Sequence, residues 1–159
     1  MPVTVIGDEA LAAKFNAAAA TLQAEKAYWL HDVGIILEEA IEANIARQGL
    51  IDTGDLIDSG RVFNQTANGV SVGFGNMLGY AEPLELGSRE HWIEAGAGWW
   101  SSATMLSFYN AKRGEWFYGP RVWHPGNRPY RFMYHGALES VVPIAFYFME
   151  RLRAIFGGL

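Results

Sequence analysis

The sequence contains no cysteine among its 159 residues, which excludes disulfide bonds, thiolate metal ligands and a cysteine nucleophile. Charged residues are also scarce, at 18% of the chain, whereas 50% of the residues are hydrophobic. Disordered chains show the opposite balance, so this composition predicts a folded protein. The length fits a single domain, residues 1–159.

Long hydrophobic runs and leader segments are lacking as well. The least polar stretch, residues 95–111, contains Gly, Ser and Asn and is shorter than the roughly 20 apolar residues that a membrane span needs. Residues 1–7 have no basic start followed by an apolar run, as a secretory signal would. We therefore expect synthesis in the cytoplasm and no membrane partner.

The charge is distributed unevenly along the chain. Residues 1–60 hold three Lys/Arg against ten Asp/Glu, and residues 112–159 hold seven against three. These charges form two solvated faces, or they meet between identical subunits, as complementary patches do in ring-closing contacts. The isoelectric point near 5.3 argues against sequence-specific nucleic-acid binding, which is typical of basic proteins.

Residues 8–48 contain no proline, and their apolar residues recur at spacings of three and four, which predicts one long helix. Asp8 is a candidate start and Gly49 a candidate stop. Forty-one helical residues span roughly 60 Å, whereas a globule of this size is about 40 Å across. We therefore expect a bend near Gly34, or an end that lies on another subunit.

Residues 52–87 are expected to form a hairpin and sheet region. Asn68-Gly69 predicts a β-hairpin between residues 61–66 and 70–74, after a single helical turn at residues 54–59. Residues 80–86 are expected to be an edge strand or extended segment, because Pro83 lacks the N–H that an inner strand needs.

The second half of the chain gives a less periodic pattern. Residues 88–120 form a Trp-rich insertion or long loop, with a candidate short helix over residues 102–109. Residues 124–156 begin with a Pro-Gly turn and end in a closing helix from residue 130, which Pro143 is expected to kink or divide. The expected fold is therefore α+β: a long N-terminal helix packed on a short antiparallel sheet, with a C-terminal helix.

No catalytic, metal or cofactor constellation is recognisable. His91 with Glu94 and His135 with Glu139 have helix-compatible spacing, but each pair lacks a third ligand. The carboxylates of residues 82 and 85 face opposite ways along an extended segment, which suits a glycosidase poorly. We therefore expect no catalytic residues, no metal, no cofactor and no enzyme activity.

Five of the six tryptophans lie between Trp92 and Trp123. They either build a small core for the insertion or form a contact surface, since aromatic residues are enriched in interfaces; a sugar-binding platform is a third reading. We expect Trp99 or Trp100 to become buried only on assembly, and Trp29 to be buried in the isolated chain. The candidate partner contacts are Trp92, Trp99, Trp100 and Trp116.

Three short segments carry distinctive motifs. The first follows the long helix and consists of Asp52, Thr53, Gly54, Leu56 and Ser59. The second is the Tyr-Ala-x-x-x-Glu-x-Gly-Ser segment of Tyr80, Ala81, Glu85, Gly87 and Ser88. The third, a looser match, contains Arg128, Pro129, Tyr130, Phe132, Ala137 and Leu138. In their order and flanks, these segments resemble the head-to-tail joining or tail-completion (neck) protein family of long-tailed bacteriophages, which often has a basic residue where this sequence has Ile57.

The resemblance covers residues 8–87 and 124–156, and it implies a structural virion protein rather than an enzyme. It implies a ring at the neck or tail end of the virion that joins head and tail, with self and neighbouring neck and tail-tube proteins as partners. Genome DNA would pass through such a ring, although the isolated protein can stay monomeric.

From the residues themselves, Gly54 and Gly87 suit unusual backbone angles, Thr53 and Ser59 suit local backbone caps, and Glu85 suits pairing with Arg128 or Arg131. Two alternatives stay open. One is a monomeric module that binds a glycan or a host protein through the Trp-rich segment, and the other, more distant, is a hydrolase.

Overall fold

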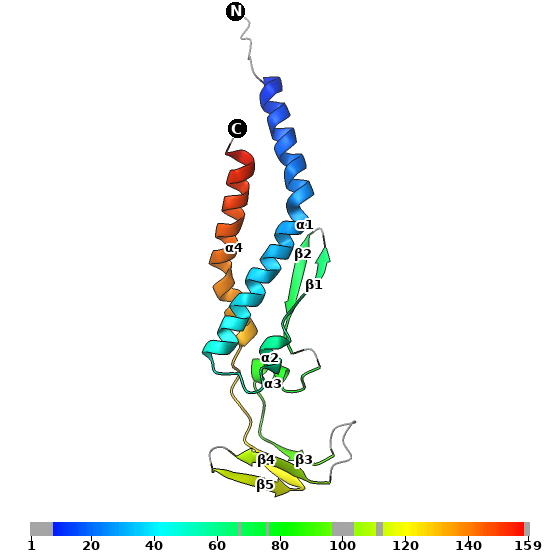
Figure 1. Ribbon diagram of the computed structural model, residues 1–159, viewed down its shortest axis with the longest axis vertical. Helices are drawn as coiled ribbons and strands as arrows, with labels where there is room; N and C mark the ends of the chain where they lie inside the picture. Colours follow the sequence, from blue (N-terminus) through cyan, green and yellow to red (C-terminus); the bar gives the residue numbers. More distant parts are fainter. Residues whose placement is uncertain (1–7, 67, 76, 97–103, 111–112, 158–159) are drawn as a thin grey trace, which may run out of the picture. The chain divides into compact units, whose positions relative to one another are not determined.

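The computed structural model describes residues 8–66, 68–75, 77–96, 104–110 and 113–157. They form an α+β protein with a long N-terminal helix, short antiparallel strand pairs and a C-terminal helix (Figure 1). The chain divides into two compact units, residues 1–81 with 131–159 (unit 1) and residues 82–130 (unit 2). The expected insertion at 88–120 therefore lies inside unit 2, which begins six residues before it and ends ten residues after it.

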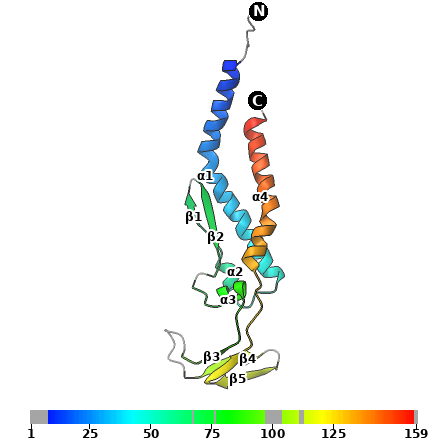
Figure 2. The same ribbon diagram turned by 180° about the vertical axis from the view of Figure 1, so that it is seen from behind.

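Unit 1 is built around the long helix α1 (Asp8–Arg47). Its end follows the expected glycine stop, because Gly49 has a φ of 67° and its N–H bonds to the carbonyl of Ala46 at 3.0 Å. The helix is continuous, and both views show that it bends along its length (Figures 1 and 2). Gly34 is a point of close approach, since a Cβ there would lie 2.7 Å from Cγ1 of Val62.

The expected hairpin is confirmed. Strand β1 (Arg61–Thr66) pairs antiparallel with β2 (Gly69–Gly73), in the register Arg61↔Gly73, and both strands pack against α1. The expected helical turn is α2 (Asp55–Asp58). Leu56 on this turn is buried, so it fastens the turn to the unit 1 core.

The expected strand at residues 80–86 is wrong, because this segment is the helix α3 (Ala81–Leu86). Pro83 is the third residue of α3, and the N–H groups of a first helical turn have no partner within the helix. Proline therefore costs little at this position, while the following Leu and Glu residues favour a helix.

The expected long loop with a helix near residues 102–109 is also wrong. In unit 2, β3 (His91–Glu94) pairs with β6 (Arg121–His124), and β4 (Leu106–Asn110) pairs with β5 (Glu115–Gly119), all antiparallel. Aromatic side chains favour strands through cross-strand packing, and Phe108 stacks on Phe117 with ring centroids 5.0 Å apart. Residues 102 and 103 of the expected helix lie outside the described residues.

The closing helix α4 (Phe132–Phe156) begins two residues later than expected and runs through Pro143 without division. It packs alongside α1 within unit 1. Phe132 at its start is 1% exposed, and Trp29 of α1 is 4% exposed, which confirms the expected burial of Trp29 in the single chain. The core of unit 1 therefore lies between α1, α4 and the short elements at the end of α1.

Candidate functional site

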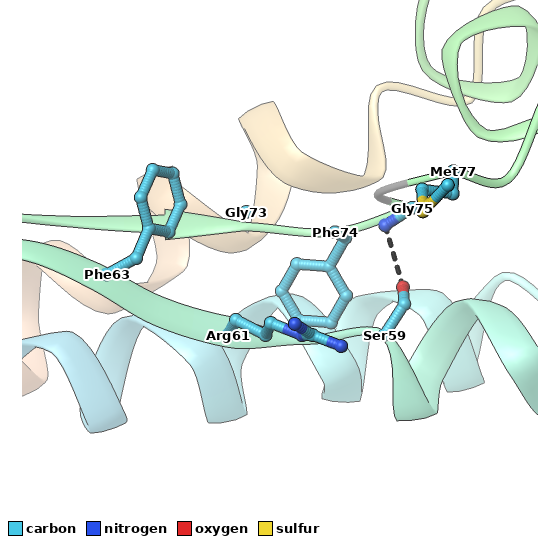
Figure 3. Close-up of a pocket in the computed structure, with 7 residues that line it drawn as sticks. All are labelled: Ser59, Arg61, Phe63, Gly73, Phe74, Gly75 and Met77. Carbon is cyan, nitrogen blue, oxygen red and sulfur yellow. Dashed lines mark hydrogen bonds between the residues drawn. The ribbon is translucent and has the colours of Figure 1, made fainter.

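The first motif has a local structural role. Gly54 adopts a left-handed φ of 96° before α2, and the Thr53 hydroxyl accepts a hydrogen bond from the Asp55 N–H at 3.3 Å. The Ser59 hydroxyl donates to the Leu56 carbonyl at 2.6 Å and accepts from the Gly75 N–H at 2.7 Å (Figure 3). These bonds confirm the expected backbone caps.

The second motif contacts the first motif within unit 1, and its end contacts the start of the third motif within unit 2. Within unit 1, the pKa of Tyr80 is raised by burial and then by the nearby carboxylates Asp55 and Asp52. Ala81 lies against Gly75, where an added Cβ would sit 2.1 Å from the Ala81 Cβ. The first motif and the start of the second motif are therefore neighbours.

Within unit 2, the end of the second motif meets the third. Gly87 has a φ of 84°, and a Cβ there would lie 2.9 Å from the Pro129 nitrogen. Ser88 and Asn127 exchange backbone hydrogen bonds of 2.9 and 3.1 Å, and the Tyr130 N–H bonds to the Leu84 carbonyl. The geometry thus confirms the expected backbone role of Gly87, while the pairing of Glu85 with an arginine stays a prediction.

A cavity of about 640 Å³ lies at the base of the β1–β2 hairpin. Arg61 is its one charged lining residue among those described, and the Ser59 hydroxyl is already committed to two backbone partners. The remaining lining is apolar or backbone: Phe63, Gly73, Phe74, Gly75 and Met77 (Figure 3). This arrangement offers an apolar recess with one cation at its edge, and no acid–base pair.

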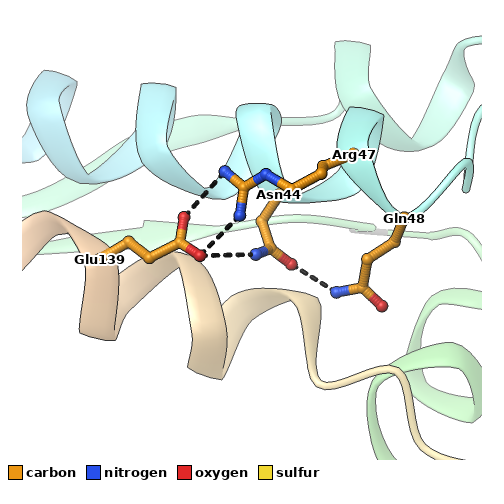
Figure 4. A network of polar contacts seen from close by, with 4 residues as sticks. All are labelled: Asn44, Arg47, Gln48 and Glu139. Atoms are coloured by element: carbon orange, nitrogen blue, oxygen red, sulfur yellow. Dashed lines mark hydrogen bonds and ion pairs between the residues drawn. The ribbon is translucent and has the colours of Figure 1, made fainter.

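One side of α4 is fixed against α1 by polar and apolar contacts. Arg47 binds both carboxylate oxygens of Glu139, at 2.6 and 3.0 Å, and Asn44 donates to the same carboxylate at 3.4 Å (Figure 4). The hydrogen bond from Arg47 lowers the pKa of Glu139 and raises the pKa of Arg47. Gly136 allows the helices to approach, since a Cβ there would lie 2.5 Å from the Ile41 Cα.

Further along the helix pair, Tyr147 donates a hydrogen bond to Asp32, and Arg151 lies 3.5 Å from the same carboxylate. Burial raises the pKa of the Tyr147 hydroxyl, and the bond to Asp32 raises it further. Phe148 meets Trp29 edge to face, with ring centroids 6.3 Å apart. These contacts set which side of α4 faces α1.

The other side of α4 carries an exposed apolar surface, here called the α4 stripe. Its side chains recur mainly at spacings of three and four, so they share one side of the helix. They are Tyr134, Leu138, Val141, Val142, Phe146, Met149, Leu152 and Phe156, and each is between 36% and 59% exposed. With roughly 150–250 Å² for each fully exposed large side chain, the α4 stripe presents on the order of 800 Å², above the largest patch of a typical monomer.

A second exposed apolar surface lies near the start of α1. Leu11 and Phe15 are 49% and 50% exposed and stand four residues apart on one side of the helix. Leu22, half-buried, continues the same side. Unit 1 therefore presents two different apolar helical surfaces.

The charge pattern does not divide between the two units as it divides along the sequence. Unit 1 holds seven Lys/Arg and twelve Asp/Glu, and unit 2 holds five of each. Glu42 on α1 has a raised pKa because of burial and because Glu38, Glu39 and Asp58 surround it. A concentrated acidic patch is therefore present on unit 1, and the meeting of opposite patches between subunits stays a prediction.

The tryptophans of the candidate contact surface lie on different strands of unit 2. Trp92 on β3 is 49% exposed, faces Trp123 edge to face and carries the Arg121 guanidinium 4.6 Å from its ring centroid. Trp116 on β5 is 59% exposed. Trp99 and Trp100 lie outside the described residues.

Several residues that carry these surfaces escape sequence reasoning. Gly136, Tyr147 and the α4 stripe lie on a helix that is apolar at most positions, so no single side stands out. Tyr109 and Tyr118, which lie beside Trp116, belong to short strands whose side chains alternate between two faces. This alternation is the sequence signal that could have identified them.

The described ranges, with their gaps, contain no group of three or more His, Asp or Glu residues placed to hold a metal ion. No helix within these ranges is long and apolar enough to cross a membrane. Comparison with protein-family models, with curated proteins and with solved structures found no match to this chain.

Proposed function

We propose that this protein is a structural component of a bacteriophage virion that assembles as a ring at the neck or tail end. The observation that carries the assembly part is the α4 stripe, an apolar helical surface whose side chains are each between 36% and 59% exposed. Its area of roughly 800 Å² equals the share that each partner contributes to a standard protein interface. Exposing that surface to water is unfavourable, which favours coverage by another chain.

A second copy of this chain is the proposed partner. Unit 1 presents the α4 stripe and the separate apolar surface around Leu11 and Phe15. A contact between two different surfaces is heterologous, and repeated heterologous contacts close into rings or extend into filaments. The ring is therefore the closed form that this pair of surfaces supports.

The placement at the virion neck rests on the three sequence motifs. Their residues hold turns and connections in place, as Gly54, Ser59 and Gly87 do, which is the work of a structural component. The proposed role is therefore non-enzymatic, with neck and tail-tube proteins as further partners and with genome DNA in the ring lumen.

The test is electron microscopy and mass spectrometry of particles purified from cells that produce this protein with its genomic neighbours. We expect several copies of the chain around the tail axis. Absence from the particle, or a single copy away from the axis, would show that the virion role is wrong.

Two variants test whether the α4 stripe is the contact surface, separately from the position of the protein in the virion. Val142→Glu places a charge in the α4 stripe, and Ala154→Glu places the same charge at an exposed position of α4 outside it. We expect both variants to fold, and only Val142→Glu to be missing from particles. Equal incorporation of both would show that the α4 stripe is not the contact.

A further inference from the structure

The β4–β5 hairpin of unit 2 sorts its aromatic side chains by type. Cross-strand partners in an antiparallel pair point to the same face, and Tyr109 pairs with Trp116 while Ser107 pairs with Tyr118. The opposite face carries Phe108 and Phe117. Rings with a hydrogen-bonding group thus occupy one face, and purely apolar rings occupy the other.

The face with Ser107, Tyr109, Trp116 and Tyr118, here called the aromatic face, is open to solvent. Its three rings are 54%, 59% and 62% exposed in sequence order. Trp116 and Tyr118 lie nearly parallel, at 27° with centroids 6.3 Å apart, and Tyr109 meets Trp116 at 62° and 5.9 Å. The phenylalanine face is turned to a groove that Phe108 lines together with Ile93, Val122 and Trp123.

The chemistry of the aromatic face matches a neutral sugar chain. A pyranose ring has an apolar face of C–H groups that packs on an aromatic ring, and an edge of hydroxyl groups that needs hydrogen-bonding partners. Tyrosine and tryptophan combine an apolar body with a polar group, and the Ser107 hydroxyl adds another. None of the four side chains is charged.

Charge argues against a nucleic acid, whose bases also stack on aromatic rings. Single-strand binders need a cationic groove for the phosphates, but unit 2 holds equal numbers of basic and acidic residues. Arg113, near the hairpin turn, lies 3.8 Å from the Glu115 carboxylate, and Arg121 lies over Trp92. Both arginines therefore already interact with another side chain of unit 2.

Area argues against a stable protein partner at this face. Three large rings, each little more than half exposed, offer roughly 400 Å². A standard protein interface needs about 800 Å² from each side. The aromatic face has the size of a few sugar units in a row.

We propose that the aromatic face is a binding site for a neutral oligosaccharide, with Trp116 as the central stacking platform and Tyr109 and Tyr118 beside it. This proposal is independent of ring assembly, because the aromatic face belongs to unit 2 and the α4 stripe belongs to unit 1. It also differs from the tryptophan set expected from the sequence, since two of its three rings are tyrosines.

The test is isothermal titration of the full chain with three probes: cellohexaose, chitohexaose and maltohexaose. We expect at least one to bind, and Trp116→Ala and Tyr118→Ala to weaken that binding by about tenfold or more. Tyr28→Ala is the control, since it removes an aromatic ring that is 74% exposed on α1 of unit 1, and it should bind as the parent does. Thermal melts establish that each variant is folded. Because two platform variants are used, the test still works if one of them does not fold.

Three results would overturn the proposal. One is the absence of binding by all three probes at about 10 mM. Another is equal binding by the parent and by folded platform variants, and the third is an equal loss in Tyr28→Ala. If no sugar binds and Trp116→Ala blocks incorporation into particles, the aromatic face is a protein contact instead.

Discussion

Replacing Gly136 by alanine tests the packing of the two long helices. An alanine Cβ would lie 2.5 Å from the Ile41 Cα and 2.9 Å from its backbone nitrogen, distances that real contacts do not reach. Both atoms belong to the backbone of α1, so relief requires a shift of one whole helix. That shift would strain the Arg47–Glu139 pair, because Glu139 lies within one helical turn of the substitution.

Two opposing terms set the size of the effect. Overpacking of a tight contact costs about 1–3 kcal/mol, whereas alanine gains up to about 1 kcal/mol over glycine in helix propensity. Because the clash is with backbone, we expect the free energy of unfolding to fall by about 1–2 kcal/mol. Urea denaturation followed by far-UV circular dichroism measures this change.

The exposed neighbour Ala137 provides the matched control. Ala137→Gly in the same turn reports the propensity term alone, with an expected loss of about 1 kcal/mol. Because Gly136→Ala gains this propensity term, adding the loss measured for Ala137→Gly to the loss measured for Gly136→Ala gives the cost of the clash. A Gly136→Ala protein as stable as the parent, or more stable, would refute the inference that α1 and α4 touch through their backbones at this point.

Three further predictions concern Gly87, Glu42 and the Arg47–Glu139 pair. Gly87→Ala should lower the free energy of unfolding by about 1 kcal/mol or more, because φ is 84° and the new Cβ would meet Pro129; an unchanged thermal melt would contradict this. Glu42→Gln should raise the melting temperature at pH 7, since the raised pKa means that the ionised carboxylate is destabilising, and the gain should vanish as the pH falls below the ordinary value of 4.5; a gain that persists at low pH would contradict it. Glu139→Gln should lower the melting temperature at pH 7, because a lowered pKa stabilises above the ordinary value, and the difference from the parent should disappear as the pH falls through the lowered pKa; Arg47→Gln should show the same loss, and a pH-independent difference would contradict the ion-pair origin.

The parts of the fold that local patterns specify were predictable. The three-and-four period of residues 8–48 gave the long helix, and Asn68-Gly69 gave the hairpin. Residues 80–86 were misread because Pro83 suits a first helical turn as well as an edge strand. The β3–β6 pair was not predicted because its strands lie far apart in the chain, and no local pattern reports such a pairing. The β4–β5 hairpin is local, and the alternation along its strands was a signal that could have predicted it.

The candidate surfaces were less predictable than the fold. The sequence predicted particular backbone roles for the motif residues, and the structure confirms these roles for Gly54, Ser59 and Gly87. The side of α4 that faces α1 depends on where a glycine and a few polar groups meet another helix, as Gly136 and Tyr147 do. Such a three-dimensional match leaves no period in the sequence.

The interruption of unit 1 by unit 2 has a consequence for folding during synthesis. The ribosome makes α1 first, then the 84 residues from 48 to 131, which include the 49 residues of unit 2, and only then α4. At about 5–20 residues per second, the side of α1 that α4 later covers waits roughly 4–17 s for its partner. During that interval Trp29 and Ile41 lack their contacts with Phe148 and Gly136 of α4, so the nascent chain passes through a state that favours premature association and binding by chaperones.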